Sequence, residues 1–361
     1  MAIFTGYRVP ERPDTMITHR MVADSNHLLW LFFQTPYRSL AFGLSADQGK
    51  TWSPGREICP DVSGPFSVFA GAAGDVYVAA RREHPQDICL FHWNGREWSR
   101  RVLLKAAEKQ EATCFPLVVE NGNKLVHVIF ASRQYSAWEW RVRHLAVDLE
   151  KPAYSEIHVP PLTGPMPNLA PPADFLKDIF YWSGDVAKTA SGNIHLACRS
   201  FSGSHYKIHH YFFNIKSSDW RLSSPFSQSP HHRGHPRIIT GSAGDTLHLV
   251  YQVEKETQDT LAHLHLGPDG RWNTESTISD RVEKDLPPET AASEYGPIVY
   301  WADGSGVSRR LLESSGIPQQ VLGVRPASLS AATCKDRVIL AYTGQEPDRQ
   351  AIFLAEDTLL A

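Results

Sequence analysis

The chain has 361 residues, of which 42% are hydrophobic and 21% are charged, the composition of a globular protein with a substantial core. Its 36 lysines and arginines against 39 aspartates and glutamates give a net charge of −3, which argues against a nucleic-acid-binding protein that relies on bulk positive charge. No apolar run approaches the roughly 20 residues of a membrane span. We therefore expect neither a nucleic-acid nor a membrane partner, while a protein partner stays open.

The cysteines indicate a reducing compartment. There are five, an odd number, at positions 59, 89, 114, 198 and 334, and no two form a Cys-x-x-Cys pair. Three lie in apolar runs, such as residues 88–91, which is typical of buried free thiols. The first residues also lack the charged head and long apolar run of a signal peptide. We predict unpaired cysteines and a cytoplasmic location.

Short apolar runs recur along the chain, each after Gly, Asn or Asp. They occupy residues 28–33, 76–80, 125–130, 194–198, 247–251, 298–301 and 338–342. A second strand-like segment follows most of them, and segments such as residues 262–266 alternate with the period of a β-strand. The spacing between runs is mostly about 40–55 residues, the range of propeller blades. No amphipathic helix of ten residues is evident, so we predict an all-β chain.

Seven runs predict one domain over residues 1–361, a seven-bladed β-propeller of four-stranded antiparallel blades. The alternative is six blades, because residues 296–312 are short and weakly patterned. The last repeat supplies about three strands, so we expect residues 3–9 to add the fourth and close the ring. Six prolines in residues 159–174 predict a stiff insertion between blades three and four.

One segment, residues 45–52, has the pattern Ser-x-Asp-x-Gly-x-Thr-Trp. Its fixed positions are Ser45, Asp47, Gly49, Thr51 and Trp52. The aspartate can accept backbone hydrogen bonds in a tight turn, the glycine allows a positive φ, and the tryptophan can cover the turn. This pattern is an Asp box, and it resembles the signature of the sialidase-like (BNR-repeat) β-propellers. Partial copies end at Trp98, Trp220 and Trp272, where the third strand of a repeat turns into the fourth.

The Asp box connects the third and fourth strands, so ligands are expected on the opposite face. That face carries the loops after the second strands and the connections between blades. The binding residues predicted there are Arg38, Arg82, Arg133, Tyr135, Trp138, Arg199 and His235. Because arginine forks bind carboxylates and sulfates, and aromatic rings stack on sugars, these residues favour an anionic carbohydrate. We predict no cofactor and no metal, since no complete metal-ligand spacing is present.

The resemblance to sialidases implies catalytic candidates. Arg20 stands where the family's first-strand arginine is expected, Arg237 is a second member of an arginine set, and Glu294 with Tyr295 resembles a glutamate-assisted tyrosine nucleophile. The sequence departs from the family in the loop at residues 34–38, which lacks the family's acid/base aspartate. Asp61 or Asp185 could substitute for it.

Three functions remain open from the sequence. The first is a sialidase-like glycoside hydrolase. The second is a polysaccharide lyase, in which Tyr295 and the histidines of residues 231–235 act as base and acid while arginine neutralises a uronate. The third is a non-catalytic binding or scaffold propeller. His263 and His265 share one side of a strand, which we interpret as a solvated face.

Overall fold

The computed structural model describes residues 2–3, 18–35, 37–62, 64–84, 86–122, 124–136, 140–160, 183–202, 205–223, 233–255, 257–284, 286–346 and 349–357. The strands form seven four-stranded antiparallel sheets, which are the blades of a propeller. Blade 1 contains β2 (His19–Ala23), β3 (Leu29–Gln34), β4 (Leu40–Ser45) and β5 (Arg56–Cys59). Blade 2 contains β6 (Ser67–Ala70), β7 (Val76–Arg81), β8 (Ile88–Trp93) and β9 (Trp98–Leu104). Blade 3 contains β10 (Glu111–Glu120), β11 (Leu125–Gln134), β12 (Arg141–Asp148) and β13 (Tyr154–Ile157).

The remaining four blades repeat this order. Blade 4 contains β14 (Gly184–Lys188), β15 (Ile194–Ser202), β16 (His205–Asn214) and β17 (Asp219–Ser223). Blade 5 contains β18 (Arg233–Thr240), β19 (Leu247–Val253), β20 (Thr260–Leu266) and β21 (Ser276–Ser279). Blade 6 contains β22 (Glu289–Ser293), β23 (Gly296–Ala302), β24 (Val307–Leu311) and β25 (Gln319–Leu322). Blade 7 contains β26 (Ser328–Cys334), β27 (Arg337–Glu346), β28 (Arg349–Asp357) and β1 (Ala2–Ile3).

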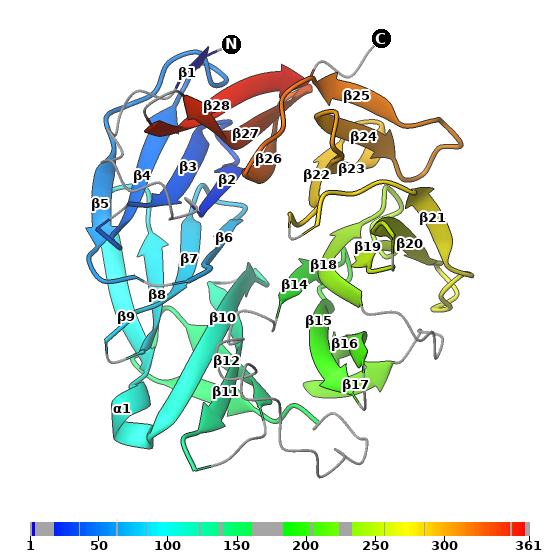
Figure 1. Cartoon of the computed structure of the whole chain (residues 1–361). Coiled ribbons are helices and arrows are strands. Elements are labelled where there is room, and N and C mark those ends of the chain that lie inside the picture. The colour runs from blue at the N-terminus through cyan, green and yellow to red at the C-terminus, as the bar shows by residue number, and fades with distance from the viewer. Residues whose placement is uncertain are drawn as a thin grey trace.

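The first strands of the seven blades surround the centre of the ring (Figure 1). First strands of neighbouring blades contact each other, including β2 with β26, where the last blade meets the first. The prediction of seven blades is confirmed, and the six-bladed alternative is wrong. Its weak segment, residues 296–312, forms the second and third strands of a complete blade 6.

Strand β1 closes blade 7 by pairing antiparallel with β28, Ala2 opposite Leu354 and Ile3 opposite Phe353. The N-terminus therefore supplies the fourth strand, as predicted. The described strand is Ala2–Ile3 instead of residues 3–9, and residues 4–17 lie outside the described residues. The proline-rich insertion predicted for residues 159–174 lies outside them too, apart from residues 159 and 160.

The apolar runs of the sequence are the second strands of the blades. Every residue of β19 and β23 is buried, and so are the first five residues of β3. These strands are continuous apolar runs because neighbouring blades cover both of their faces. Trp30, for example, packs in one cluster with Phe91 of the next blade. Full burial of such a side chain contributes about 1.5–3 kcal/mol.

Other predictions concern helix content and cysteines. One helix, α1 (Ala106–Lys109), is present in the described part of the chain. No helix there is long and apolar enough to cross a membrane. All five cysteines are buried and unpaired, as predicted.

The turn at residues 45–52 joins β4 to β5 with the predicted hydrogen bonds. The Asp47 carboxylate accepts the backbone N–H of Thr51 at 2.8 Å and its hydroxyl at 2.6 Å. Hydrogen bonds from Thr51 lower the pKa of Asp47 to about 2. Gly49 has φ of 87°, and its carbonyl accepts the indole N–H of Trp52 at 3.0 Å. We call the side of the ring that carries this turn the turn face, and the opposite side the axial face.

Three consecutive blades bury hydrogen-bonded histidine pairs between their second and third strands. In each pair, Nδ1 of the first ring lies within 3.0 Å of Nε2 of the second: His127 and His144, His195 and His210, His248 and His263. Trp220 of blade 4 donates its indole N–H to Nδ1 of His144, so His144 accepts there and donates from Nε2. This network holds neutral rings, and burial lowers the pKa of His127 to about 4.

The solvated face predicted for His263 and His265 is wrong. Both rings stack on His248, whose ring centroid lies 5.2 Å from that of His263 and 4.7 Å from that of His265. Glu313, which follows β24 of blade 6, lies 3.2 Å from Nε2 of His248. Blade 6 thus packs over the side of blade 5 that the alternation pattern assigned to solvent, and burial lowers the pKa of His263 to about 3.

Candidate functional site

Four charged side chains from the first strands of four blades meet near the centre of the ring. Arg20 lies on β2, Asp185 on β14, Arg237 on β18 and Glu289 on β22. Nη1 of Arg20 donates to Oε1 of Glu289 at 3.1 Å, and Nη2 of Arg237 donates to the same oxygen at 2.8 Å. We call this group of four residues the axial site. It lies toward the axial face, where the first strands begin.

Blade 7 lies between blade 1, which carries Arg20, and blade 6, which carries Glu289. Its first strand, β26, has the sequence Ser-Leu-Ser-Ala-Ala-Thr-Cys, in which the side chains are mostly small. Ser330 of this strand hydrogen-bonds Nδ1 of His19 at 2.8 Å. The small side chains of β26 therefore allow blades 1 and 6 to interact across the strand between them.

The axial site is only partly accessible. The side chain of Arg20 is 30% exposed, against 9% for Arg237 and 12% for Glu289. Both hydrogen bonds recorded for Arg20 within the described residues come from Nη1, to Glu289 and to the carbonyl of His19. Arg20 is therefore the most accessible of these three side chains.

The charged groups in the axial site shift one another's pKa values. Burial raises the pKa of Asp185, and the charge of Glu289 adds to this rise, against the opposing effects of Arg237 and of the Ile238 N–H. Burial lowers the pKa of Arg20, and Arg237 contributes. For Arg237, burial is outweighed by Glu289 and Asp185, so its pKa is raised. The site thus holds two guanidinium groups and two carboxyl groups, of which Asp185 has a raised pKa.

His235 and Arg199 extend the site beside Arg237. The pairing of β18 with β19 shifts between Gly234 and Arg237, and His235 within this bulge has φ of 51°. Burial lowers the pKa of His235 to about 3, aided by the charges of Arg199 and Arg237. A Cβ at Gly234 would lie 3.2 Å from Nη1 of Arg199, so glycine makes room for this buried guanidinium.

The other predicted binding residues lie farther out on the axial face. Arg38 forms an ion pair with Glu83, and Arg82 lies 3.8 Å from Asp61. Arg133 stands over the ring of Trp140 at 5.5 Å. Tyr135 follows β11 and is 56% exposed. These residues lie at or just after the ends of second strands, so the structure brings them to the same face as the axial site. Trp138, His231 and His232 lie outside the described residues.

The structure separates Glu294 and Tyr295 from the arginines. Both lie in the turn between β22 and β23, at the opposite end of β22 from Glu289. This turn is on the turn face, and Tyr295 is 51% exposed. The nucleophile role that the sialidase resemblance implies for them requires a position beside the arginines, and the hairpin of β22 and β23 places them at the other end of the strand. A nucleophilic tyrosine at position 295 beside Arg20 and Arg237 is therefore excluded by position.

Glu289 was missed in the sequence. It is the first residue of β22 and follows two prolines, at positions 287 and 288. Its position corresponds to those of Arg20 and Asp185 at the start of other first strands. Recognition of β22 as a first strand would have identified it.

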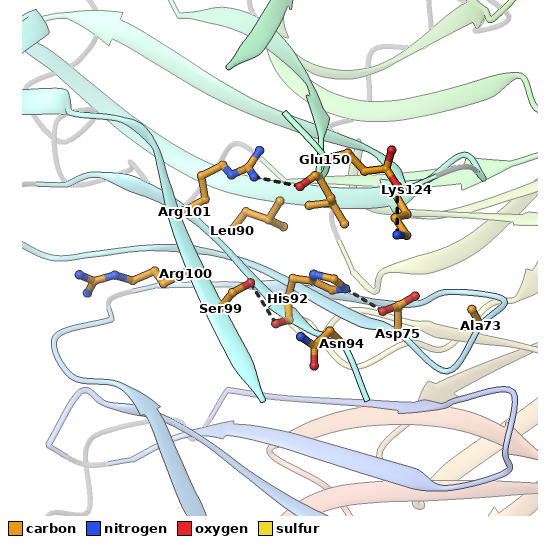
Figure 2. A pocket seen from close by; sticks show the side chains of 11 residues that line it. Ala73, Asp75, Leu90, His92, Asn94, Ser99, Arg100, Arg101, Lys124 and Glu150 are labelled. Atoms are coloured by element: carbon orange, nitrogen blue, oxygen red, sulfur yellow. Dashed lines mark hydrogen bonds and ion pairs between the residues drawn. The ribbon is translucent and has the colours of Figure 1, made fainter. Parts of the chain in front are cut away.

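A second candidate is a cavity of about 590 Å³ on the turn face, between blades 2 and 3 (Figure 2). The charges that line it are largely paired with one another. His92 bonds Asp75 at 2.7 Å, Lys124 bonds Glu150 at 3.1 Å, and Arg101 donates to the carbonyls of Asp148 and Lys151. Arg100 points away from these groups in Figure 2. This lining joins two blades, so the cavity is a weaker candidate than the axial site.

No group of three or more His, Cys, Asp or Glu side chains is arranged to hold a metal ion among the described residues. The side chains of the axial site offer anion binding by guanidinium groups, and Asp185 and His235 are groups that can exchange protons. Arginine forks recognise carboxylates and sulfates.

Comparisons with known proteins place the fold among propellers. No family model matches the chain, and no curated protein matches it. Among solved structures, a polysaccharide lyase of family PL25, an ulvan lyase bound to -[GlcA(1-4)Rha3S]-, is similar with a TM-score of 0.62 at 8% identity, over 98% of both chains. An α-L-arabinofuranosidase from Fusarium graminearum, bound to an iminosugar inhibitor, has a TM-score of 0.57 at 12% identity over 99% of this chain and 97% of its own. A protein of unknown function from Dyadobacter fermentans has a TM-score of 0.56 at 12% identity, over 98% of this chain and 99% of its own.

At these identities the likeness is one of fold. The chain is a seven-bladed β-propeller, and several solved propellers of similar structure are carbohydrate-active enzymes.

Proposed function

We propose that the protein is a sialidase-like propeller that binds, and cleaves, an anionic carbohydrate at the axial site. The observation that carries the proposal is the convergence of Arg20 and Arg237 on one oxygen of Glu289 at the centre of the ring. Glu289 fixes both guanidinium groups, and it neutralises only one of their two charges. The guanidinium group of Arg20, the most exposed of these side chains, then binds a carboxylate or sulfate of the sugar.

The similar solved structures support a carbohydrate ligand. One of them is a lyase bound to a saccharide of glucuronate and sulfated rhamnose, and another is a glycoside hydrolase bound to an iminosugar. Arg82, Arg133 and Tyr135 on the same face would contact sugars beyond the one bound at the centre. Arginine side chains there favour further anionic groups, and the exposed Tyr135 ring offers a stacking surface.

Elimination is the second candidate reaction, and His235 favours it. The β18 bulge holds this residue, and burial, aided by the charges of Arg199 and Arg237, lowers the pKa of His235 to about 3, so its ring is neutral. A neutral imidazole accepts a proton, and a neighbouring arginine stabilises the carboxylate of a uronate from which the proton is removed. Tyr295 takes no part, since it lies on the turn face.

The proposal is tested with sialylated, uronate-containing and sulfated glycans. Reducing ends and the ultraviolet absorbance of unsaturated products are followed together, and binding is measured by calorimetry. New reducing ends without absorbance support hydrolysis, and both signals together support elimination. Binding without either signal leaves a binding propeller, and no binding of any anionic glycan contradicts the proposal.

A further inference from the structure

A glycoside hydrolase needs a proton donor, and the loop after β3 offers no carboxyl group. This loop, residues 35–39, consists of Thr, Pro, Tyr, Arg and Ser. Protonation of the leaving oxygen has to come from another part of the axial face. Two aspartates, Asp61 and Asp185, are the candidates.

Asp61 is held at the edge of the face. It lies between β5 and β6, its Oδ2 accepts the backbone N–H of His84 at 3.2 Å, and Nη2 of Arg82 lies 3.8 Å away. Its side chain is 32% exposed. Both polar partners of Asp61 therefore belong to blade 2, outside the axial site.

Asp185 has the opposite environment. It lies on the first strand of blade 4, and its Oδ2 accepts the backbone N–H of Ile238 on β18 at 3.0 Å, so its position is fixed between two blades. The charged groups that face it are Arg237, Glu289 and Arg20. Two carboxyl groups thus share one site, and they are held differently.

The difference decides which of the two carries a proton. Glu289 accepts hydrogen bonds from two guanidinium groups, which stabilise its charge. Asp185 accepts hydrogen bonds from backbone N–H groups, and it is half-buried close to the charge of Glu289. Ionisation of Asp185 in addition to Glu289 therefore costs more free energy than ionisation of Glu289 alone. The direction of its pKa, raised by burial, agrees with this assignment.

We infer that Asp185 is the proton donor for glycosidic bond cleavage at the axial site, and that Glu289 is a positioning residue that holds Arg20 and Arg237 on the substrate's anionic group. This inference rests on the proposed binding of an anionic carbohydrate. The Asp185 carboxyl proton passes to the glycosidic oxygen as its bond to the anomeric carbon breaks and the electron pair stays on that oxygen. Water supplies the hydroxyl that bonds the anomeric carbon. Its remaining proton goes to solvent, from which Asp185 is protonated again.

The test compares two leaving groups in the full-length protein. The substrates are 2,4-dinitrophenyl glucuronide, whose leaving group needs no protonation, and a glucuronide disaccharide, whose leaving alcohol does. We expect Asp185→Asn to lower kcat/KM on the disaccharide by about 10²–10⁴-fold. Its kcat/KM on the dinitrophenyl substrate should change by less than about 10-fold, because no acid is needed there. The asparagine oxygen still accepts the Ile238 N–H, so folding is retained. Asp269→Asn, exposed in the turn between β20 and β21 on the turn face, is the matched control, and its activity on both substrates should be unchanged.

Three results would overturn the inference. The first is equal loss on both substrates in Asp185→Asn, which would mean a structural role. The second is an unchanged rate on the disaccharide. The third is wild-type protein that binds glucuronides in calorimetry yet cleaves neither substrate. Absence of glucuronide binding is a different result, because it removes the proposed function itself along with the inference.

Discussion

Arg20 and Glu289 are 269 positions apart in the sequence and lie on blades that are not neighbours, yet their side chains form a hydrogen bond of 3.1 Å. The bond passes β26 of blade 7, whose side chains are mostly small. Arg237 adds a second bond to the same glutamate oxygen from blade 5. Three blades thus contribute to one charged group at the centre of the ring, and this group exists only when the ring is closed.

The arginines should be needed for binding, and unequally. Arg20→Ala removes the more exposed guanidinium, so we expect the Kd for a uronate oligosaccharide to rise about 10-fold to 100-fold, the value of one or two charge-assisted hydrogen bonds. Arg237→Ala should have a smaller direct effect because its side chain is 9% exposed. Calorimetry measures both. Arg96→Ala, in an exposed turn on the turn face, is the control and should bind as the wild type does.

Glu289 should be needed for stability. Glu289→Gln leaves two half-buried or buried guanidinium groups without a carboxylate, and breaking a buried pair in this way costs about 3 kcal/mol. Urea unfolding followed by tryptophan fluorescence measures the loss. Glu294→Gln, in the exposed turn at the other end of β22, should change stability by less than about 0.5 kcal/mol. Equal effects of the two variants would contradict the role of Glu289 in the axial site.

The histidine pairs should make the fold sensitive to acid. Burial lowers the pKa of His195 to about 4 and that of His210 to about 3, from 6.5 for an unperturbed histidine. The unfolded chain therefore takes up these protons first, and stability is complete above pH 6.5 and falls as the pH drops from 6.5 toward 4. In this window each such histidine lowers the free energy of unfolding by about 1.4 kcal/mol for every pH unit that the pH drops.

The pH dependence is measured by urea unfolding between pH 8 and 5. His210→Gln should make the curve less steep by the contribution of one histidine, because glutamine keeps a hydrogen-bonding group beside His195 and does not titrate. His84→Gln, at an exposed position, should leave the wild-type curve unchanged. A wild-type curve that is flat across this range would contradict the neutral pairs.

The Asp-box-like turn should contribute to folding and not to binding. Asp47→Ala removes two hydrogen bonds from Thr51, so we expect a loss of about 1–2 kcal/mol in the free energy of unfolding. Carbohydrate affinity should stay within about twofold, since the turn lies on the opposite face from the axial site. Lys50→Ala, exposed in the same turn, is the control. A loss of affinity in Asp47→Ala at a temperature where the variant is folded would contradict this separation of roles.

The sequence predicts the fold well because its signals are local. The apolar runs are second strands, which are buried on both faces and therefore lack polar positions. The bonds of Asp47 and the φ of Gly49 follow from eight consecutive residues. The ring could be counted from such repeats, and only the weakest blade, with β22 at Glu289–Ser293, left the number open.

The site was predicted in part, since it depends on contacts between distant blades. Arg20 was expected in a first strand and lies in β2, whereas Arg237 lies in the middle of β18. Nothing near either residue in the sequence indicates Glu289. Tyr295 was misplaced for the same reason that Glu289 was missed, namely the unrecognised hairpin of β22 and β23. The histidine pairs did leave a signal, because their partners are 17, 15 and 15 residues apart in three successive repeats.

The most direct test of carbohydrate binding at the axial site uses one oligosaccharide in two forms. A glucuronate-containing oligosaccharide and its carboxyl-reduced counterpart, in which glucose replaces glucuronate, are titrated into the wild-type protein and Arg20→Ala. We predict at least about 10-fold tighter binding of the charged form by the wild type, and no such preference in the variant. Equal affinity of the wild type for both forms, or a preference that survives in Arg20→Ala, would contradict an anion site built on Arg20, Arg237 and Glu289.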